Sequence, residues 1–185
     1  MTLHFTKMQG IANDYIYIDC FRESIEGIDI PSLSQKLSRR RFSVGADGII
    51  LIMPSDIADC RMEIYNADGS LAKMCGNGIR CVGKYAADRG IVSGDTVTVE
   101  TRSGIKTLTV KRDERGEVRT VRVDMGEYST ESGDLPTTLE NTISVPLYAD
   151  GEETLVTCVS MGNPHCVIFR DENPDDFPVE SFGPK

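Results

Sequence analysis

The sequence contains no tryptophan, only two histidines and no C-x-x-C pair. With so few imidazoles and no paired thiol motif, a structural zinc site is not expected, and no other metal is implied. No stretch approaches the roughly 20 consecutive apolar residues of a membrane-spanning helix. The first residues, MTLHFTK, also lack the basic and apolar regions of a secretory signal. These absences favour a cytoplasmic protein with no membrane partner.

Basic residues are scarce as well. Lys and Arg number 20 against 29 Asp and Glu, so the formal net charge is −9, and the one basic run is Arg39–Arg41. Nucleic-acid binders usually concentrate basic side chains on one face. The charge balance therefore predicts no nucleic-acid partner, while it leaves a small-molecule substrate open.

The six cysteines are even in number, which is compatible with three disulfides. Without a signal for export, and with 39% apolar residues to build a core, reduced thiols are the better interpretation. Most of them are expected to be small buried hydrophobic residues. The cysteines are Cys20, Cys60, Cys75, Cys81, Cys158 and Cys166.

Strand-like runs dominate the chain. Two alternating runs flank Arg102–Ile105 and predict a β-hairpin. The predicted strands are residues 3–8, 15–20, 49–53, 60–65, 96–101, 106–111, 118–124, 143–148, 154–160 and 166–170.

Two segments carry helical signals. Residues 32–41 follow Pro31, a favourable residue for a first helical turn. Residues 77–88 are apolar on nearly all sides and end at Arg89 and Gly90, and a helix of this kind is normally buried. The pattern predicts an α+β fold in which a curled, mostly antiparallel sheet surrounds a central helix.

The 185 residues allow one large domain, or one complete domain and part of another. Residues 126–138 are polar and read as a link, after which strands resume. The tail from residue 170 is rich in Asp and Pro and has no apolar period. We interpret residues 1–120 as a first domain with its central helix at about 77–88. Residues 121–185 are interpreted as the truncated beginning of a second.

The stretch KMCGNGIRC places Cys75 at a predicted helix start, followed by Gly76, Asn77 and Gly78. Unpaired backbone N–H groups and the helix dipole stabilise a thiolate there, and an anion such as a carboxylate suits the same position. A buried cysteine ahead of a helix cap is the competing interpretation. Cys81, inside the helix, is predicted to belong to the core.

Asparagines stand at three predicted strand boundaries: Asn13, Asn66 and Asn163. Turn chemistry explains any one of them, because Asn favours turns. Three such residues in a chain with a candidate reactive cysteine also indicate a binding site, since Asn contacts both carboxylate and ammonium groups.

Together these segments resemble the diaminopimelate epimerase family. The resemblance extends from the N-terminus to Lys185, and the block from Asn66 to Cys81 is its most specific part. Related proline racemases usually carry His where this chain has Asn77. The matching segments read KMQGIANDYIYID, RRRFSVGADGIILI, MEIYNADGSLAKMCGNGIRCVGKYAAD, ETRSGI and VSMGNPHCVIF.

The resemblance implies an isomerase that interconverts LL- and meso-diaminopimelate for lysine and peptidoglycan synthesis. Such enzymes use no cofactor: one cysteine thiolate removes the α-proton and a second cysteine thiol protonates the opposite face. Two similar domains, each with a helix inside a sheet, close on the substrate. The resemblance also suggests a homodimer for the full-length protein.

Residue by residue, the resemblance makes Cys75 the first acid/base thiol. Gly76 and Asn77 would bind the α-carboxylate through their amides. Substrate contacts are implied for Asn13, Asn66 and Asn163, and a supporting role for His165.

The chain departs from the family pattern at three places. Ala12 stands where the family usually has Gly, and Gly48 where many members have a substrate-contacting Gln. The Ala-Cys-Gly-Thr-Gly-like block with the second cysteine, and the Glu-Arg pair before it, do not occur in these residues. The resemblance therefore implies an N-terminal part of a longer epimerase, inactive by itself.

Three alternatives stay open. A proline- or hydroxyproline-type isomerase of the same fold differs in substrate. A cysteine hydrolase would use Cys75 with His165 and needs the imidazole within hydrogen-bond reach of the thiol. A non-catalytic remnant would bind a diamino diacid without turnover.

Overall fold

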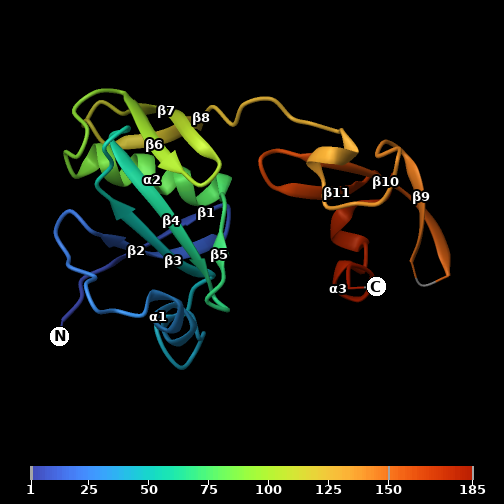
Figure 1. Ribbon diagram of the computed structural model, residues 1–185, viewed down its shortest axis with the longest axis horizontal. Coiled ribbons are helices and arrows are strands. Elements are labelled where there is room, and N and C mark those ends of the chain that lie inside the picture. Colours follow the sequence, from blue (N-terminus) through green and yellow to red (C-terminus); the bar gives the residue numbers. More distant parts are fainter. Residues whose placement is uncertain (1, 150, 185) are drawn as a thin grey trace. The chain divides into compact units, whose positions relative to one another are not determined.

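The computed structural model describes residues 2–149 and 151–184 (Figure 1). The chain divides into two compact units, Met1–Met125 and Gly126–Lys185. We describe each unit by itself. The interpretation of two epimerase domains, with a boundary after residue 120, stays a prediction.

The first unit is built on a mixed sheet in the order β1-β2-β3-β4-β6-β7-β8, with β5 paired to β4. The pairs β2–β3 and β4–β6 are parallel, and the other neighbours are antiparallel. The predicted mostly antiparallel sheet is thus confirmed. Its strands are β1 (Thr6–Gly10), β2 (Asn13–Asp19), β3 (Gly48–Met53), β4 (Cys60–Asn66), β5 (Leu71–Ala72), β6 (Thr96–Thr101), β7 (Gly104–Arg112) and β8 (Val118–Val123).

Helix α2 (Gly76–Asp88) is the central helix of this unit (Figure 1). It contacts β1 and β8, the two ends of the sheet order, as well as β2, β4, β6 and β7, so the sheet curls around it. Ala86 and Ala87 are buried, and a Cβ added to Gly83 would lie 2.6 Å from Leu108 Cδ2. The predicted buried helix with small packing residues is therefore confirmed. It begins one residue earlier than predicted, and Gly90 follows its C-cap with a φ of +72°.

Alternate residues of β2 and β3 face opposite sides of the sheet and build two cores. Tyr17 and Ile50 belong to the core around α2. Ile16, Ile18 and Leu51 belong to a second core, against which Leu33 and Leu37 of α1 pack.

Helix α1 (Ile30–Leu37) corrects the predicted helix 32–41 at both ends. Asp29 is its N-cap and accepts a hydrogen bond from the Ser32 amide at 3.2 Å, so the helix begins before Pro31. It ends with Ser38 as C-cap, and the basic residues that follow form a turn.

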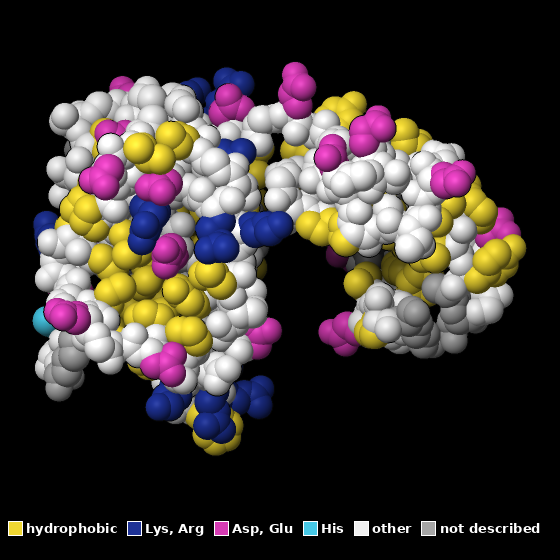
Figure 2. Space-filling model, viewed as in Figure 1, with side chains coloured by type: hydrophobic (Ala, Val, Ile, Leu, Met, Phe, Trp, Pro, Cys, Tyr) yellow, Lys and Arg dark blue, Asp and Glu magenta, His cyan; other side chains and the backbone are white. Residues whose placement is uncertain are grey.

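The exposed basic run Arg39–Arg41 follows α1. Figure 2 shows Lys and Arg side chains gathered at this lower end of the first unit, and basic and acidic side chains interspersed over the rest of its visible face. Within residues 2–149 and 151–184, no helix is both long and apolar enough to cross a membrane. The same residues contain no group of three His, Cys, Asp or Glu side chains arranged to hold a metal ion.

The second unit contains an antiparallel sheet in the order β11-β10-β9. After it, Arg170 stacks on the rings of Phe177 and Phe182. The strands are β9 (Val145–Ala149), β10 (Glu152–Ser160) and β11 (Pro164–Ile168), and a short helix α3 (Val179–Phe182) comes near the end of the chain.

The burial of the cysteines corrects one expectation. All six are free thiols, but only Cys60 and Cys81 are buried. Cys166 is exposed, and the other three are half-buried. The expectation that most would be core residues is wrong because Cys75 caps a helix end, and because Cys158 and Cys166 lie on the small sheet of the second unit.

Candidate active site

Cys75 is the N-cap residue of α2. Its backbone is extended, with φ −141° and ψ 106°, so that its side chain turns back toward the first turn of the helix. The sulfur accepts a hydrogen bond from the Gly78 amide at 3.3 Å. The thiol thus occupies the position of a capping oxygen, at the positive end of the helix dipole.

Strand β2 supplies a further donor to this sulfur. Asn13, Tyr15 and Tyr17 are spaced by two and share the face of β2 that lies toward α2. Asn13 Nδ2 donates to Cys75 Sγ at 3.7 Å, and the Tyr15 hydroxyl is close enough to the thiol for its pKa to be affected by it. Tyr17 donates from its hydroxyl to the Gly78 carbonyl at 3.3 Å. Two donors, the Gly78 amide and the Asn13 side chain, therefore converge on one sulfur, an arrangement suited to a thiolate.

Tyr15 and Tyr17 are the site residues that sequence reasoning missed. Both are almost fully buried, at 5% and 1% exposed. Burial raises the pKa of the Tyr15 hydroxyl, and the neighbouring Cys75 thiol raises it further. Tyr15 thus stays protonated and remains a donor. Their spacing of two residues from Asn13 places all three side chains on one face of β2. This spacing is the feature of the sequence that could have identified them.

Asn13 also carries an unused acceptor. Its Oδ1 is buried and has no hydrogen-bond partner among the described residues. Orphaned buried acceptors are rare in folded proteins, and a bound ligand is one usual explanation. This atom lies on the amide group that touches the Cys75 sulfur.

Glycines allow the first turn of α2 to pack closely. A Cβ at Gly78 would lie 2.6 Å from Ile50 Cδ1, and one at Gly10 would lie 3.0 Å from the Asn77 carbonyl oxygen. A Cβ at Gly76 would meet only Met125, at an ordinary 3.8 Å. Gly78 and Gly10 are thus needed for packing, while the backbone at Gly76 is uncrowded.

The first-turn amides of α2 form the polar rim of the site. The helix supplies no acceptors for the amides of its first turn. Asn77 uses its side-chain oxygen to accept a hydrogen bond from Arg80 Nη2. Backbone amides at a helix N-terminus are suited to an anion.

Asn66 ends β4 and is held within a turn. Its Nδ2 donates to Ser70 Oγ at 3.0 Å, and its carbonyl accepts from the Gly69 amide at 2.9 Å. Turn chemistry accounts for these contacts. Gly48 is its partner on β3, and a Cβ at Gly48 would lie 2.1 Å from the Tyr65 carbonyl oxygen. This backbone has no room for the Gln side chain that many family members carry at this position.

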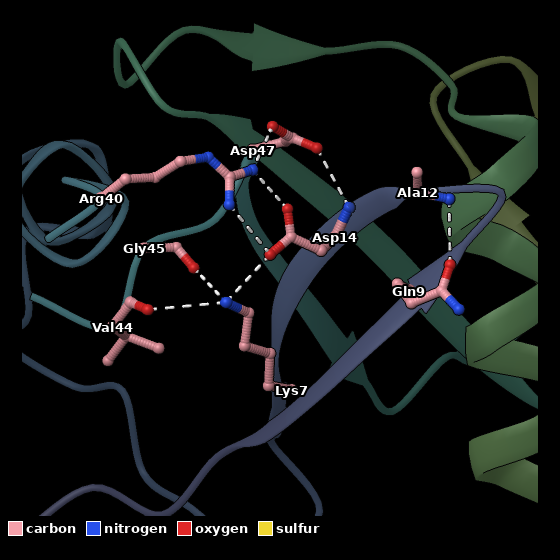
Figure 3. A network of polar contacts seen from close by, with 8 residues as sticks. All are labelled: Lys7, Gln9, Ala12, Asp14, Arg40, Val44, Gly45 and Asp47. Carbon is pink, nitrogen blue, oxygen red and sulfur yellow. Dashed lines mark hydrogen bonds and ion pairs between the residues drawn. The ribbon is translucent and has the colours of Figure 1, made fainter.

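A charged network holds Asp14, the neighbour of Asn13 (Figure 3). Arg40 contacts the carboxylates of both Asp14 and Asp47, and Lys7 Nζ lies 2.9 Å from Asp14 Oδ2. The Asp14 amide donates to Asp47 Oδ2 at 3.0 Å, and the Asp47 carbonyl accepts from the Ala67 amide at 2.9 Å. The network thereby ties the start of β2 to the turn after Asn66.

This network gives a prediction for acid stability. The Arg40 guanidinium, with help from Lys7, lowers the pKa of Asp14 from 3.8 to about 2. Because the pKa is lower in the folded state, the stabilisation is present at neutral pH and is lost as the pH falls from about 4 to about 2. Because the Arg40 side chain is 56% exposed, solvent screens the ion pair. The ion pair therefore contributes less to stability than the pKa shift alone implies. Asp14→Asn should lower the free energy of unfolding by about 1 kcal/mol at neutral pH.

Urea unfolding of both proteins at neutral pH and at about pH 2 measures this effect. The difference between them should shrink at the lower pH. Asp56→Asn, which changes an exposed carboxylate outside the network, is the control. A difference that is equally large at both pH values would contradict the assignment to Asp14 ionisation.

The turn before Asn13 is tight. Ile11 and Ala12 link β1 and β2 with φ of +53° and +60°, and the Ala12 amide donates to Gln9 Oε1 at 3.0 Å (Figure 3). Both residues are in the left-handed region, as in the two-residue turns that favour Gly and Asn. Ala12 therefore adopts a left-handed conformation that glycine adopts without strain. This conformation lowers the stability of the fold by about 1 kcal/mol.

Asn163 and His165 belong to the second unit. Asn163 lies in the turn between β10 and β11, and its Oδ1 is 3.2 Å from His165 Nε2. The structure thus brings together Asn13, Cys75, Gly76 and Asn77 in the first unit, and Asn163 with His165 in the second.

Comparison with known proteins assigns the family. The sequence profile of the family "Diaminopimelate epimerase" matches residues 5–131. The diaminopimelate epimerase of Acetivibrio thermocellus is 48% identical over 99% of this chain and 65% of its own length. That of Pelotomaculum thermopropionicum is 46% identical, over 98% of this chain and 65% of its own length.

A similar fold is seen in the crystal structure of a probable proline racemase of Agrobacterium radiobacter K84 with bound carbonate. The TM-score is 0.67, over 90% of this chain and 52% of the racemase, and the identity of 15% shows the fold alone. The α+β fold expected from the sequence is confirmed by this likeness. The chain spans about 65% of the length of the curated relatives it matches. From the profile and the identity to these relatives, the chain belongs to the diaminopimelate epimerase family.

Proposed function

We propose that the full-length protein is a cofactor-independent isomerase that interconverts LL- and meso-diaminopimelate in lysine and peptidoglycan precursor synthesis. The observation that carries the proposal is Cys75, a helix-capping thiol that accepts hydrogen bonds from the Gly78 amide and from Asn13. The diaminopimelate epimerases at 46–48% identity support the choice of substrate.

Cys75 would act as acid or base at the substrate α-carbon. As a thiolate, its sulfur accepts the α-proton, and the electron pair left on the α-carbon is delocalised into the α-carboxylate. A second thiol, expected outside these 185 residues, donates a proton to the opposite face. In the reverse direction the two thiols exchange roles. The hydrogen bonds from the Gly78 amide and the Asn13 side chain would hold the sulfur in place at the start of α2.

The first turn of α2 would hold the α-carboxylate. The amides of Gly76 and Asn77 point from a helix N-terminus, where charge that develops on a carboxylate is stabilised. The uncrowded backbone at Gly76 permits close approach of the ligand.

We assign the other substrate contacts to the asparagines. Asn13 offers its orphaned Oδ1 to the substrate ammonium group. Asn66 and Asn163 are further contacts, and His165, next to Asn163, supports that side chain. Residues after about 120 would begin a second, similar domain that brings Asn163 and His165 to the substrate. A homodimer in the cytoplasm is the assembly we expect for the full-length protein.

A substrate panel tests the proposal. The complete reading frame, purified under reductant, is incubated with LL-diaminopimelate, L-proline and trans-4-hydroxy-L-proline, and the stereoisomers are separated by chiral chromatography. We expect epimerisation of diaminopimelate alone. Turnover of a proline derivative without turnover of diaminopimelate would select the proline-type alternative, and binding without turnover would select the non-catalytic one.

A further inference from the structure

Two cysteines outside the candidate active site face each other across the hairpin β10–β11. Cys158 on β10 and Cys166 on β11 are direct partners in the antiparallel register. Cys166 is exposed and Cys158 is half-buried. Neither residue has a part in the proposed reaction.

The backbone hydrogen bonds define the type of this pair. The Cys158 amide donates to the Thr142 carbonyl at 2.8 Å, away from β11. Because the N–H and C=O of a strand residue point the same way, Cys158 and Cys166 form a non-hydrogen-bonded pair. Two residues on, Ser160 pairs with Pro164, which has no N–H to donate, and this agrees with the same pattern.

Non-hydrogen-bonded pairs bring side chains closest together. Their Cα atoms lie about 4.5 Å apart, within the range of about 4.4–6.8 Å that a disulfide spans. The register places the two side chains directly opposite each other on the same face of the hairpin, and burial raises the pKa of Cys166. A bond between the sulfurs therefore needs no movement of the strands.

We propose that Cys158 and Cys166 form a reversible cross-strand disulfide by exchange with a low-molecular-weight disulfide such as oxidised glutathione. The exposed Cys166 thiolate attacks one glutathione sulfur, the glutathione disulfide breaks, and one glutathione thiolate leaves. The Cys158 thiolate then attacks the Cys166 sulfur of the mixed disulfide and releases the second glutathione. The protein loses two protons and two electrons, and the glutathione disulfide gains them.

The bond would close the segment that carries Asn163 and His165. Oxidation would thus fix the strands on both sides of two proposed substrate contacts. The disulfide itself does not depend on the proposed function, and its test needs no activity.

Met161 lies between the two cysteines and makes the test direct. Cyanogen bromide cleaves after methionine and yields residues 126–161, with Cys158, and residues 162–185, with Cys166. The 185-residue chain is treated with oxidised glutathione, which leaves methionine unoxidised, and its free thiols are then alkylated. We expect a monomer on a non-reducing gel whose two fragments stay linked until dithiothreitol separates them.

Two variants and one condition sharpen this test. Cys166→Ser should lose the linked fragments, whereas Cys20→Ser, a change at another half-buried cysteine, should keep them. Because the pKa of Cys166 is raised, linkage should form faster at about pH 9 than at about pH 7. Separate fragments, glutathione retained on Cys166, or a disulfide-linked dimer would each overturn the proposal.

Discussion

Replacing Cys75 with alanine is expected to lower the rate of diaminopimelate epimerisation by the complete protein about 10³-fold or more. The substitution removes the group that accepts or donates the α-proton on one face, and no neighbour of the sulfur can replace it. Asn13 and the Gly78 amide are donors to that sulfur, and the raised pKa of Tyr15 keeps its hydroxyl protonated, so that it cannot accept the α-proton. Chiral chromatography of the reaction mixture measures the loss.

Cys81→Ala is the matched control, because it removes a thiol from the same helix. Cys81 is 6% exposed and belongs to the core around α2, as predicted from the sequence. Its variant should retain most of the activity if circular dichroism shows that it folds. Equal losses in the two variants, or a Cys75→Ala protein that still turns over at the wild-type rate, would contradict the role of Cys75.

Gly83→Val is expected to lower the free energy of unfolding by about 3 kcal/mol. A Cβ at this position would lie 2.6 Å from Leu108 Cδ2 and 3.2 Å from Val121 Cγ1, and Leu108 is fully buried. The helix lies inside the curl of the sheet, so it cannot move away from β7 without losing packing on its other sides. Urea denaturation followed by circular dichroism measures the change.

Gly94→Val is the matched control for this substitution. Gly94 is exposed, and a Cβ there would meet only the Thr96 amide nitrogen, at 3.9 Å. We expect a change within about 0.5 kcal/mol for this variant. A similar loss in both variants would mean that the cost comes from valine itself and not from the packing of α2 against β7.

The central helix could be predicted from the sequence because its residue pattern is compatible with few structures other than a buried helix. A segment that is apolar on nearly all sides has to be buried, and Gly83, Ala86 and Ala87 indicate close packing. Cys75 at its start followed from the small residues after it. The structure adds the Asn13 side chain as a donor to the sulfur, and this residue belongs to β2, some 60 residues earlier in the chain.

Other features were beyond sequence reasoning because they depend on pairing between distant segments. The parallel pairs β2–β3 and β4–β6 join strands separated by long connections, which no local pattern specifies. The network around Asp14 likewise unites three segments. The ends of α1 were misplaced because the capping role of Asp29 outweighed the apolar spacing after Pro31.

Asn66 shows that residue type alone can predict a position in the fold without predicting the contacts of the side chain. Its position at a strand end was predicted and is observed, but its side chain bonds to Ser70 within its own turn. The contact to substrate proposed for it therefore competes with that hydrogen bond. Asn13 differs, because its buried Oδ1 lacks a partner in the described part of the chain.

The measurement that tests the account most directly is α-hydrogen exchange in deuterated water. LL-diaminopimelate is incubated under reductant with the complete protein and, in parallel, with its Cys75→Ala variant, and deuterium at the α-carbons is followed by mass spectrometry. The account predicts uptake of deuterium into the meso product with the wild-type protein and no deuterated meso product with the variant. Absence of uptake with the folded wild-type protein, or equal uptake with both, would contradict a diaminopimelate epimerase that uses Cys75 for proton transfer.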